Sequence, residues 1–159
     1  MENKSITTHF QFYQFEELSA DYQRIVSIAK EQTQKSYSPY SHFAVGAAVL
    51  LNDGEVFAGN NQENAAYPSG LCAERTTIFY ANAQCPEIPV KAIAIAAFTN
   101  GEFLVEPVAP CGACRQVLLE TETRFSQPMQ ILLYGQSGIY VVESVKDLLP
   151  LCFTKESLT

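Results

Sequence analysis

Hydrophobic residues recur every three or four positions between residues 15 and 35, and this spacing predicts an amphipathic helix. The repeating positions are Leu18, Tyr22, Ile25, Val26 and Ala29. The segment Ser38-Pro39-Tyr40-Ser41 is expected to end this helix. The first fourteen residues show no clear period. We therefore expect residues 1–14 to be an N-terminal extension, either an arm or a partly ordered segment, that precedes a single domain spanning residues 15–159.

Short apolar runs predict the strands. Residues 43–51 and 56–59 flank the turn Asn52-Asp53-Gly54-Glu55 and read as a hairpin. Residues 90–98 form a near-continuous run of Ile and Ala, as expected of a buried central strand. The last two strands are expected at 129–134 and 139–142. Helices are expected at 72–83 and 111–122, and Ser144 is expected to cap a short helix that ends near Pro150.

The predicted order is helix, two strands, helix, strand, helix, two strands, helix. This alternation predicts an α/β protein, a three-layer α/β/α sandwich with a mixed five-stranded sheet. In such sheets, functional sites gather where strands lead into the starts of helices. The segments that begin at residues 72 and 111 both lie at such a place.

Composition and charge exclude several classes of function. A chain of 159 residues with 47% hydrophobic and 17% charged residues is sufficient for one globular core. Seventeen acidic and ten basic residues give a net charge of −7, so we expect no nucleic-acid partner. No apolar run approaches the roughly 20 residues of a membrane span, so we expect no membrane role. Five cysteines, an odd number, and a polar start without a signal peptide predict a reduced, cytoplasmic setting.

Three cysteines supply the candidate chemistry. Cys111 and Cys114 are three positions apart at the start of a predicted helix, so they lie on one face of its first turn. Cys72 opens another predicted helix and must approach from elsewhere in the fold. Thiolates bind zinc well, and the positive end of a helix dipole favours the thiolate form. The three cysteines predict a catalytic zinc ion with one open coordination position.

Charged residues adjoin both cysteine motifs. Glu74 lies two positions after Cys72, which on an ideal helix is about 200° away, so it is a poor ligand but can curl toward a substrate beside the metal. Three thiolates give a zinc site net negative charge. Arg75 and Arg115 are candidates to offset this charge through hydrogen bonds to the sulfurs or to the surrounding backbone. The alternative for both is an ordinary helix-surface arginine.

Other interpretations of the cysteines stay open at this point. A closed structural zinc site needs a fourth ligand, and Cys85, Cys152, His9 and His42 are not spaced as a second pair. A non-catalytic zinc module would bind the ion with the same ligands and use the fold for protein contacts. A redox role for Cys111 and Cys114 is the third option, because this spacing also suits dithiol exchange.

Several separated motifs occur in one order between about residues 36 and 153. They are SPYSHF at 38–43, VGAA at 45–48, NQENA at 61–65, CAER at 72–75 and PCGACRQ at 110–116. Together they resemble the small homotetrameric zinc-dependent cytidine deaminases. The chain departs from the commonest pattern with Ala44 in place of proline, Gln62 in place of an aliphatic residue, and a longer N-terminal segment.

The resemblance implies a reaction and a cofactor. The reaction is hydrolytic deamination of cytidine and 2'-deoxycytidine to uridine and 2'-deoxyuridine with release of ammonia, as part of pyrimidine salvage. By this resemblance Cys72, Cys111 and Cys114 bind one Zn²⁺ per subunit, which activates a water molecule to attack C4 of the base. Glu74 is then the catalytic residue that shuttles protons, and Arg75 balances the charge of the thiolates.

The resemblance also implies substrate contacts and an assembly. The implied substrate-binding residues are Phe43, Asn61, Glu63, Ala65, Tyr67, Ala73 and Phe153. Asn61 and Glu63 would bond the ribose 3'-hydroxyl, although loop residues such as Asn also cap their own backbone. Phe43 would face the base and Tyr67 the 5' end. Phe153 matches a C-terminal phenylalanine that reaches a neighbouring active site, so a homotetramer with shared sites is implied.

Two rivals lie within the same fold. Blasticidin S, a nucleoside antibiotic that contains cytosine, is deaminated with similar metal motifs, but Asn61, Glu63 and Arg75 favour the plain nucleoside. Deoxycytidylate and polynucleotide deaminases usually carry His-x-Glu in place of the Cys72-Ala73-Glu74 found here. The net charge of −7 also disfavours a phosphorylated substrate.

Overall fold

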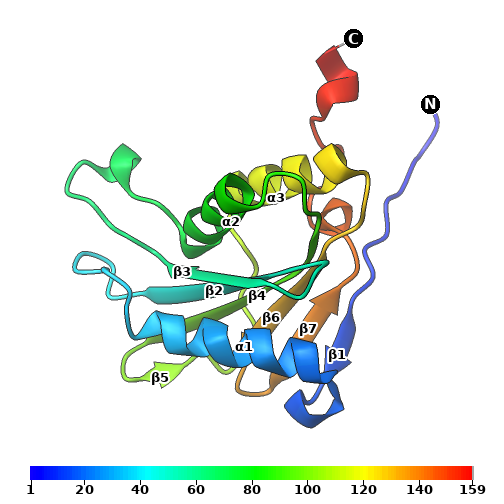
Figure 1. The fold of residues 1–159 in the computed structure, drawn as a ribbon. Helices are drawn as coiled ribbons and strands as arrows, with labels where there is room; N and C mark the ends of the chain where they lie inside the picture. Colours follow the sequence, from blue (N-terminus) through cyan, green and yellow to red (C-terminus); the bar gives the residue numbers. More distant parts are fainter. Residues whose placement is uncertain (159) are drawn as a thin grey trace.

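A seven-stranded sheet lies between helices in the computed structural model, which describes residues 1–158 (Figure 1). The α-helices are α1 (Ala20–Thr33), α2 (Ala73–Gln84) and α3 (Gly112–Phe125). The strands are β1 (Gln11–Tyr13), β2 (Ala44–Leu51), β3 (Val56–Asn60), β4 (Val90–Thr99), β5 (Glu102–Phe103), β6 (Gln130–Gly135) and β7 (Gly138–Val142). Short 3-10 helices are η1 (Phe15–Glu17), η2 (Tyr67–Ser69), η3 (Val145–Leu148) and η4 (Lys155–Leu158).

The direction of the strands determines where the helices begin. The sheet has the order β1-β7-β6-β4-β2-β3, and β5 pairs with β4. Because β3 and β4 are both antiparallel to β2, they run in the same direction and end at the same edge of the sheet. α2 follows β3, and α3 follows β4 after the two-residue β5 and a loop. Both helices therefore begin at this one edge, where sites form in α/β sheets.

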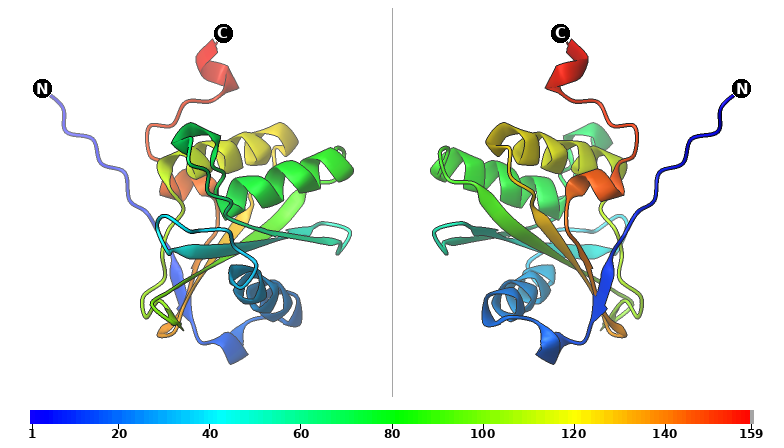
Figure 2. Two further views of the ribbon diagram at one scale, coloured as in Figure 1. Left: turned by 90° about the vertical axis from the view of Figure 1, so that its left-hand side faces the viewer. Right: turned by 90° about the vertical axis from the view of Figure 1, so that its right-hand side faces the viewer.

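Two apolar layers separate the sheet from its helices. Ile93 in β4 packs with Ile78 of α2 and Leu118 of α3, whereas the next residue, Ala94, packs with Val26 of α1. Successive side chains of a strand point to opposite faces, so a continuous apolar run fills both layers. Figures 1 and 2 show α1 on one face of the sheet and α2 and α3 on the other. The predicted three-layer α/β/α sandwich is confirmed.

The predicted number of five strands is wrong, because the sheet has seven. β1 lies within the segment that showed no clear period, and it pairs antiparallel with the edge strand β7. β5 is two residues long, which is too short to give a periodic pattern. Both extra strands are formed by pairing with distant partners rather than by a local pattern, so the sequence carries little sign of them.

Gly46 allows α1 to pack closely against β2. A Cβ atom at this position would lie 2.0 Å from the carbonyl oxygen of Ala29 in α1 and 2.7 Å from the backbone nitrogen of Thr33. Backbone atoms cannot move aside as a flexible side chain does, so a larger residue would push α1 away from the sheet. This contact accounts for the glycine in the segment Val45–Ala48.

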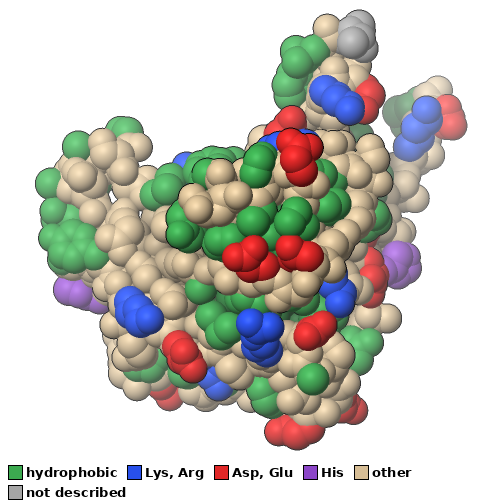
Figure 3. Space-filling model, viewed as in Figure 1, with side chains coloured by type: hydrophobic (Ala, Val, Ile, Leu, Met, Phe, Trp, Pro, Cys, Tyr) green, Lys and Arg blue, Asp and Glu red, His purple; other side chains and the backbone are tan. Residues whose placement is uncertain are grey.

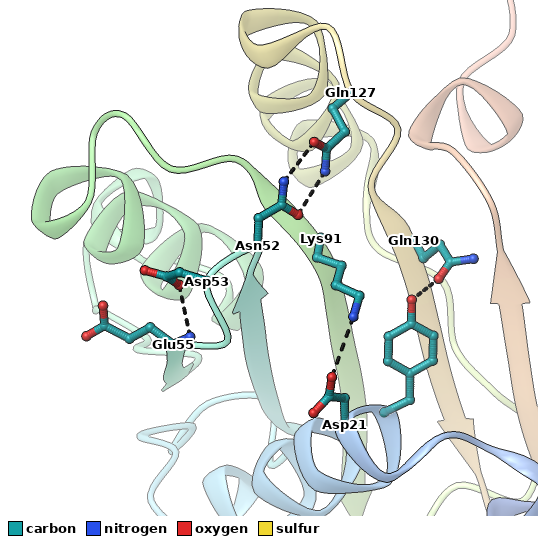
Figure 4. A network of polar contacts seen from close by, with 8 residues as sticks. Asp21, Asn52, Asp53, Glu55, Lys91, Gln127 and Gln130 are labelled. Carbon is teal, nitrogen blue, oxygen red and sulfur yellow. Dashed lines mark hydrogen bonds and ion pairs between the residues drawn. The ribbon is translucent and has the colours of Figure 1, made fainter.

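Polar contacts join the edge of the sheet opposite to the starts of α2 and α3 (Figure 4). Asn52 follows β2, and its side-chain amide exchanges two hydrogen bonds of 2.8 and 3.0 Å with the amide of Gln127, which follows α3. Lys91 in β4 forms an ion pair of 3.5 Å with Asp21 in α1. These exposed contacts connect loops and layers, and each alone contributes little to the free energy of folding.

Both ends of the described chain leave the body on the side of α2 and α3 (Figure 2). Before β1 the N-terminal segment is extended and exposed, and Thr8 Oγ1 donates a hydrogen bond of 2.8 Å to the carbonyl of Asp147 in η3. Phe10 and Phe12 lie beside the ring of Tyr140, with centroids 4.8 and 5.8 Å away. Among residues 1–158, no helix combines the length and the hydropathy that a membrane crossing requires.

A buried glutamate anchors the end of α3. Glu122 is 5% exposed. Its carboxylate accepts hydrogen bonds from the backbone N–H of Met129 at 3.1 Å, from the backbone N–H of Val145 at 2.9 Å and from the Ser144 hydroxyl at 2.7 Å. One side chain therefore joins the end of α3 to the starts of β6 and η3. Buried carboxylates are tolerated when several donors compensate their desolvation in this way.

We predict that Glu122→Ala lowers the free energy of unfolding by about 3 kcal/mol, because two buried backbone N–H groups lose their acceptor. Urea denaturation followed by circular dichroism measures this change. Glu120→Ala, at an exposed position of the same helix, is the matched control and should change stability by less than about 0.5 kcal/mol. Equal effects of the two substitutions would contradict a structural role for the buried carboxylate.

Candidate metal centre

Three thiols meet at the edge of the sheet where α2 and α3 begin. Cys72 is the N-cap residue of α2, Cys111 is the N-cap residue of α3, and Cys114 lies in the first turn of α3. The Cys72 sulfur lies 3.9 Å from that of Cys111, which lies 3.5 Å from that of Cys114. All three sulfurs are within 4.8 Å of one another. The predicted convergence of two helix starts is confirmed.

The dimensions of this group fit a zinc ion. Zinc–sulfur bonds of about 2.3 Å in a tetrahedral site place the sulfurs roughly 3.8 Å apart, close to the separations found here. Within residues 1–158 the group contains the three thiols and no fourth histidine, cysteine or carboxylate ligand. Cys114 is buried whereas Cys111 is exposed, so the group lies at the surface of the core. Three soft ligands with one side open are typical of a catalytic rather than a structural zinc site.

Hydrogen bonds favour the thiolate form of Cys72. A hydrogen bond from Cys114 and contacts with Arg75 and Cys111 lower the pKa of the Cys72 thiol to about 5. The same bond with Cys72, together with burial, raises the pKa of Cys114 because this thiol keeps the shared proton. Arg75 Nη2 donates to the Cys72 sulfur at 3.6 Å, and this bond raises the pKa of Arg75. A positive charge therefore lies against the thiols, as a dication with three thiolates requires.

Glu74 is 5% exposed and lies beside Cys114. Burial is the main cause that raises the pKa of its carboxyl, and the negative charge of Cys72 adds to the effect. The side chain therefore turns to the metal group, although two residues on a helix separate it from Cys72 by roughly 200°. A carboxyl with a raised pKa next to a metal site is suited to accepting and releasing protons.

A cavity of about 500 Å³ opens beside the thiols. Its wall combines the start of α2 with the loop between β3 and α2, and Figure 3 shows this loop standing out from the body with apolar side chains gathered on it. The lining residues are Tyr40, Ser41, Asn61, Gln62, Glu63, Asn64, Tyr67, Gly70, Leu71, Cys72 and Arg75. The structure thus brings Asn61, Glu63 and Tyr67 to the same cavity as the metal group.

Asn61 is held firmly by its own chain. Its side-chain oxygen accepts from the Ser36 hydroxyl at 2.5 Å and from the Val45 backbone N–H at 2.7 Å, and its amide nitrogen donates to the Phe43 carbonyl at 2.9 Å. These three bonds fix the chain on both sides of Phe43. One N–H of the amide has no partner among the described residues, so it is available to a bound molecule.

Glu63 caps the turn that precedes Phe43. Its carboxylate accepts from the backbone N–H groups of Tyr40 at 2.8 Å and of Ser41 at 3.2 Å. Hydrogen bonds from the Ser41 side chain and from these amides lower the pKa of Glu63. The residue is therefore ionised at neutral pH. A carboxylate offers about four acceptor positions, so these bonds leave capacity for a ligand hydroxyl.

The other residues that the resemblance implied are not among the residues that line this cavity. Phe43 is half-buried at the start of β2, Ala65 is exposed in the loop, and Ala73 is buried in the core. Phe153 is 58% exposed on the C-terminal segment. Phe43 nevertheless lies next to Asn61, because its backbone carbonyl accepts a hydrogen bond of 2.9 Å from the Asn61 amide.

Arg115 does not contact the sulfurs. It donates to the backbone carbonyls of Pro110 and Leu148 instead, so of the two candidate arginines Arg75 is the one that bonds a thiol. The sequence reasoning also left out Tyr40, whose ring meets that of Tyr67 edge to face at a centroid distance of 6.1 Å. The signal for Tyr40 was present, because it lies within the motif at residues 38–43.

Comparison with known families identifies the region that carries the thiols. Residues 19–126 match the family described as "Cytidine and deoxycytidylate deaminase zinc-binding region". This range contains the three cysteines of the metal group and more than half of the chain. The family's description names zinc as the bound metal, and the donor set and spacing of the three thiols fit a zinc ion. The predicted zinc cofactor is confirmed.

Individual relatives agree with the family match. A cytidine deaminase of Sporosarcina psychrophila is 40% identical over 139 residues, covering 87% of this chain and 96% of the relative. One of Halalkalibacterium halodurans is 40% identical over 138 residues, covering 87% and 98%. The crystal structure of a cytidine deaminase from Burkholderia pseudomallei superposes with a TM-score of 0.71 at 42% identity, covering 83% and 98%. The resemblance seen in the sequence motifs is confirmed, and the chain belongs to the zinc-binding cytidine and deoxycytidylate deaminase family.

Proposed function

We propose that this chain is a zinc-dependent hydrolase that converts cytidine and 2'-deoxycytidine to uridine and 2'-deoxyuridine with release of ammonia. The reaction returns cytosine nucleosides to the uracil series, which is a step of pyrimidine salvage. The observation that carries the proposal is the position of the buried Glu74 beside a three-thiol group at the edge of a cavity of about 500 Å³. The many free thiols favour the reduced cytoplasm as its location.

Glu74 has the position and the environment of a general acid and base. It accepts the proton that water loses on attack at C4, passes it to ring N3, and assists proton delivery to the departing amine. Burial raises the pKa of Glu74, so this carboxylate holds an accepted proton more readily than an exposed glutamate does. When bound by Cys72, Cys111 and Cys114, zinc supplies the Lewis-acid chemistry that makes water nucleophilic at this pH. The products balance as uridine and ammonia from cytidine and water.

Asn61 and Glu63 are proposed to bind the ribose 3'-hydroxyl. Asn61 keeps one amide N–H as a donor, and Glu63 keeps acceptor capacity, so one hydroxyl can receive from the first and donate to the second. Their bonds to the turn at residues 36–45 hold both groups in place before substrate arrives. The same turn carries Phe43, which we propose to face the base together with Ala65 and Ala73. Prior positioning lowers the entropy cost of binding.

The charge of the cavity favours a nucleoside over a nucleotide. Among its described lining residues, Arg75 is the one cationic side chain, and it is bonded to Cys72. Glu63 is ionised on the same wall. A 5'-phosphate would therefore enter a cavity that carries a carboxylate and offers no free cation, which makes its binding free energy less favourable.

The assembly is proposed to be a homotetramer in which neighbouring subunits complete each active site. Tyr67 is 77% exposed and Phe153 is 58% exposed, although both are large apolar side chains near the metal half of the molecule. Exposed aromatic side chains are common anchors of protein interfaces. We propose that Phe153 enters the site of an adjacent subunit and that Tyr67 lies at the 5' end of the nucleoside.

We predict that Glu74→Gln keeps one zinc per chain while kcat for cytidine falls by about 10² to 10⁴-fold, because the amide cannot transfer protons. Uridine formation and metal analysis of the same samples measure both effects. Glu120→Gln, exposed on α3, is the matched control and should retain full activity. A near-normal rate for Glu74→Gln would remove the assigned role.

We also predict that cytidine and 2'-deoxycytidine are both deaminated, whereas kcat/KM for cytidine 5'-monophosphate is lower by about 10²-fold, from the repulsion and desolvation of the phosphate. Ammonia release measured with each substrate under the same conditions tests this order. Blasticidin S belongs in the same panel. Faster turnover of blasticidin S than of cytidine would favour the antibiotic as the substrate, and equal turnover of the nucleotide would contradict the charge argument.

A third prediction concerns the assembly. The native chain should elute as a tetramer in size-exclusion chromatography with light scattering, and Phe153→Ala should lower kcat/KM about tenfold through the loss of an apolar contact with the nucleoside. Phe79→Ala, at an exposed position in the middle of α2, controls for the loss of an exposed ring. A fully active monomer would contradict the shared site.

A further inference from the structure

Arg115 links the metal-binding turn to a distant part of the chain. Its Nε donates to the carbonyl of Pro110 at 2.8 Å, and its Nη1 donates to the carbonyl of Leu148 at 2.6 Å. Pro110 is buried and directly precedes the N-cap residue Cys111. Leu148 is the last residue of η3, 33 positions away in the sequence. One guanidinium therefore fixes both the entry to α3 and the end of η3.

The next residue extends this contact along the C-terminal segment. Gln116 Nε2 donates to the backbone carbonyl of Phe153 at 2.9 Å. Between these two bonded carbonyls, the side chains of Leu149 and Cys152 pack against the core layer that contains α2 and α3. Residues 148–153 are thus held against the first turn of α3 by two side chains, while the ring of Phe153 stays 58% exposed.

We propose that Arg115 is a positioning residue that couples the metal-binding turn to the segment at residues 148–153. One of the two carbonyls that it bonds belongs to the turn that carries Cys111, and the other belongs to the segment that carries Phe153. The bonds of Arg115 therefore fix the position of the turn relative to the segment. Metal binding and the order of the C-terminal segment then depend on each other. The value of this coupling for catalysis rests on the proposed function, in which Phe153 serves a neighbouring active site.

The chemistry of the guanidinium distinguishes this role from charge balance. Arginine presents its N–H groups in a rigid planar fork, so two acceptors that lie in different directions can be bonded at once. Lysine carries the same charge as a single flexible point. If Arg115 acted through its charge on the thiolates, lysine would replace it. If it acts by bonding two carbonyls, lysine and glutamine should both fail.

The test compares Arg115→Gln and Arg115→Lys with the native chain. Zinc affinity is measured by competition with a chromogenic chelator, and the order of residues 148–154 is measured by amide hydrogen exchange with α1 as the internal reference. We expect both variants to bind zinc about 10 to 100-fold more weakly and to exchange about tenfold faster at residues 148–154. Native zinc affinity and exchange in Arg115→Gln, or their full retention in Arg115→Lys, would overturn the proposal.

Two further samples make the result specific. Arg124→Gln removes another α3 arginine that bonds a backbone carbonyl, that of Pro86, and should leave zinc affinity and exchange at residues 148–154 unchanged. A change as large as that of Arg115→Gln would overturn the proposal. Gln116→Leu removes the bond to the Phe153 carbonyl but keeps both bonds of Arg115. It should loosen residues 148–154 and weaken zinc binding less than Arg115→Gln does, because coupling between two sites is reciprocal. Unchanged exchange in this variant, or a loss of zinc affinity as large as that of Arg115→Gln, would count against the proposed coupling.

The native chain alone provides a test if the Arg115 variants do not fold. Zinc removal should speed amide exchange at residues 148–154 and leave α1 unchanged, whereas equal exchange in the stripped and loaded protein overturns the coupling. None of these readouts requires turnover. A native protein that is inert toward cytidine would therefore disprove the proposed function without deciding the coupling, and the two failures are distinguishable.

Discussion

Three sulfurs from two helix starts must meet within the bonding distance of one ion, and most of the architecture around the site follows from this requirement. The meeting is possible because β3 and β4 run in the same direction, so the helices that follow them begin at one edge of the sheet. Cys72 and Cys111 are both N-cap residues, where the backbone has not yet entered the helix and N–H groups concentrate positive potential. The fold therefore supplies the position of the thiols and part of the field that favours their ionised form.

The charge of the thiols then determines the roles of their neighbours. Three thiolates around a dication carry net negative charge, and Arg75 bonds the Cys72 sulfur directly. Glu74 is buried in the same negative surroundings, which raises its pKa rather than lowering it. A structural zinc site does not require a buried carboxyl with a raised pKa beside an open cavity. A dithiol redox site requires two sulfurs and not a third. The combination favours proton transfer to a bound molecule.

Local patterns in the sequence predicted the parts of this site that depend on local structure. The helices expected at 72–83 and 111–122 are found at Ala73–Gln84 and Gly112–Phe125, and the spacing of Cys111 and Cys114 placed both on the first turn. β1 and β5 could not be predicted, because distant partners create them. The hydrogen bonds of Asn61 and Glu63 to the turn at residues 36–45 are also tertiary. For Glu74, ideal helix geometry fixed the direction of Cα–Cβ but not the path of a long side chain at a helix end, and burial beside Cys114 decides that path.

The first turn of α3 serves both the metal and the C-terminal segment. Cys111 and Cys114 supply two of the three thiols, and Cys114 is also buried in the core. The next two residues, Arg115 and Gln116, bond the C-terminal segment. Successive residues of a helix are about 100° apart, so Cys114 can enter the core while Arg115 and Gln116 reach the two ends of residues 148–153. A shift of the turn would therefore move the metal ligands and the C-terminal segment together. If Phe153 completes a neighbouring site, each subunit's metal-binding turn also sets the geometry of a site that it does not itself contain.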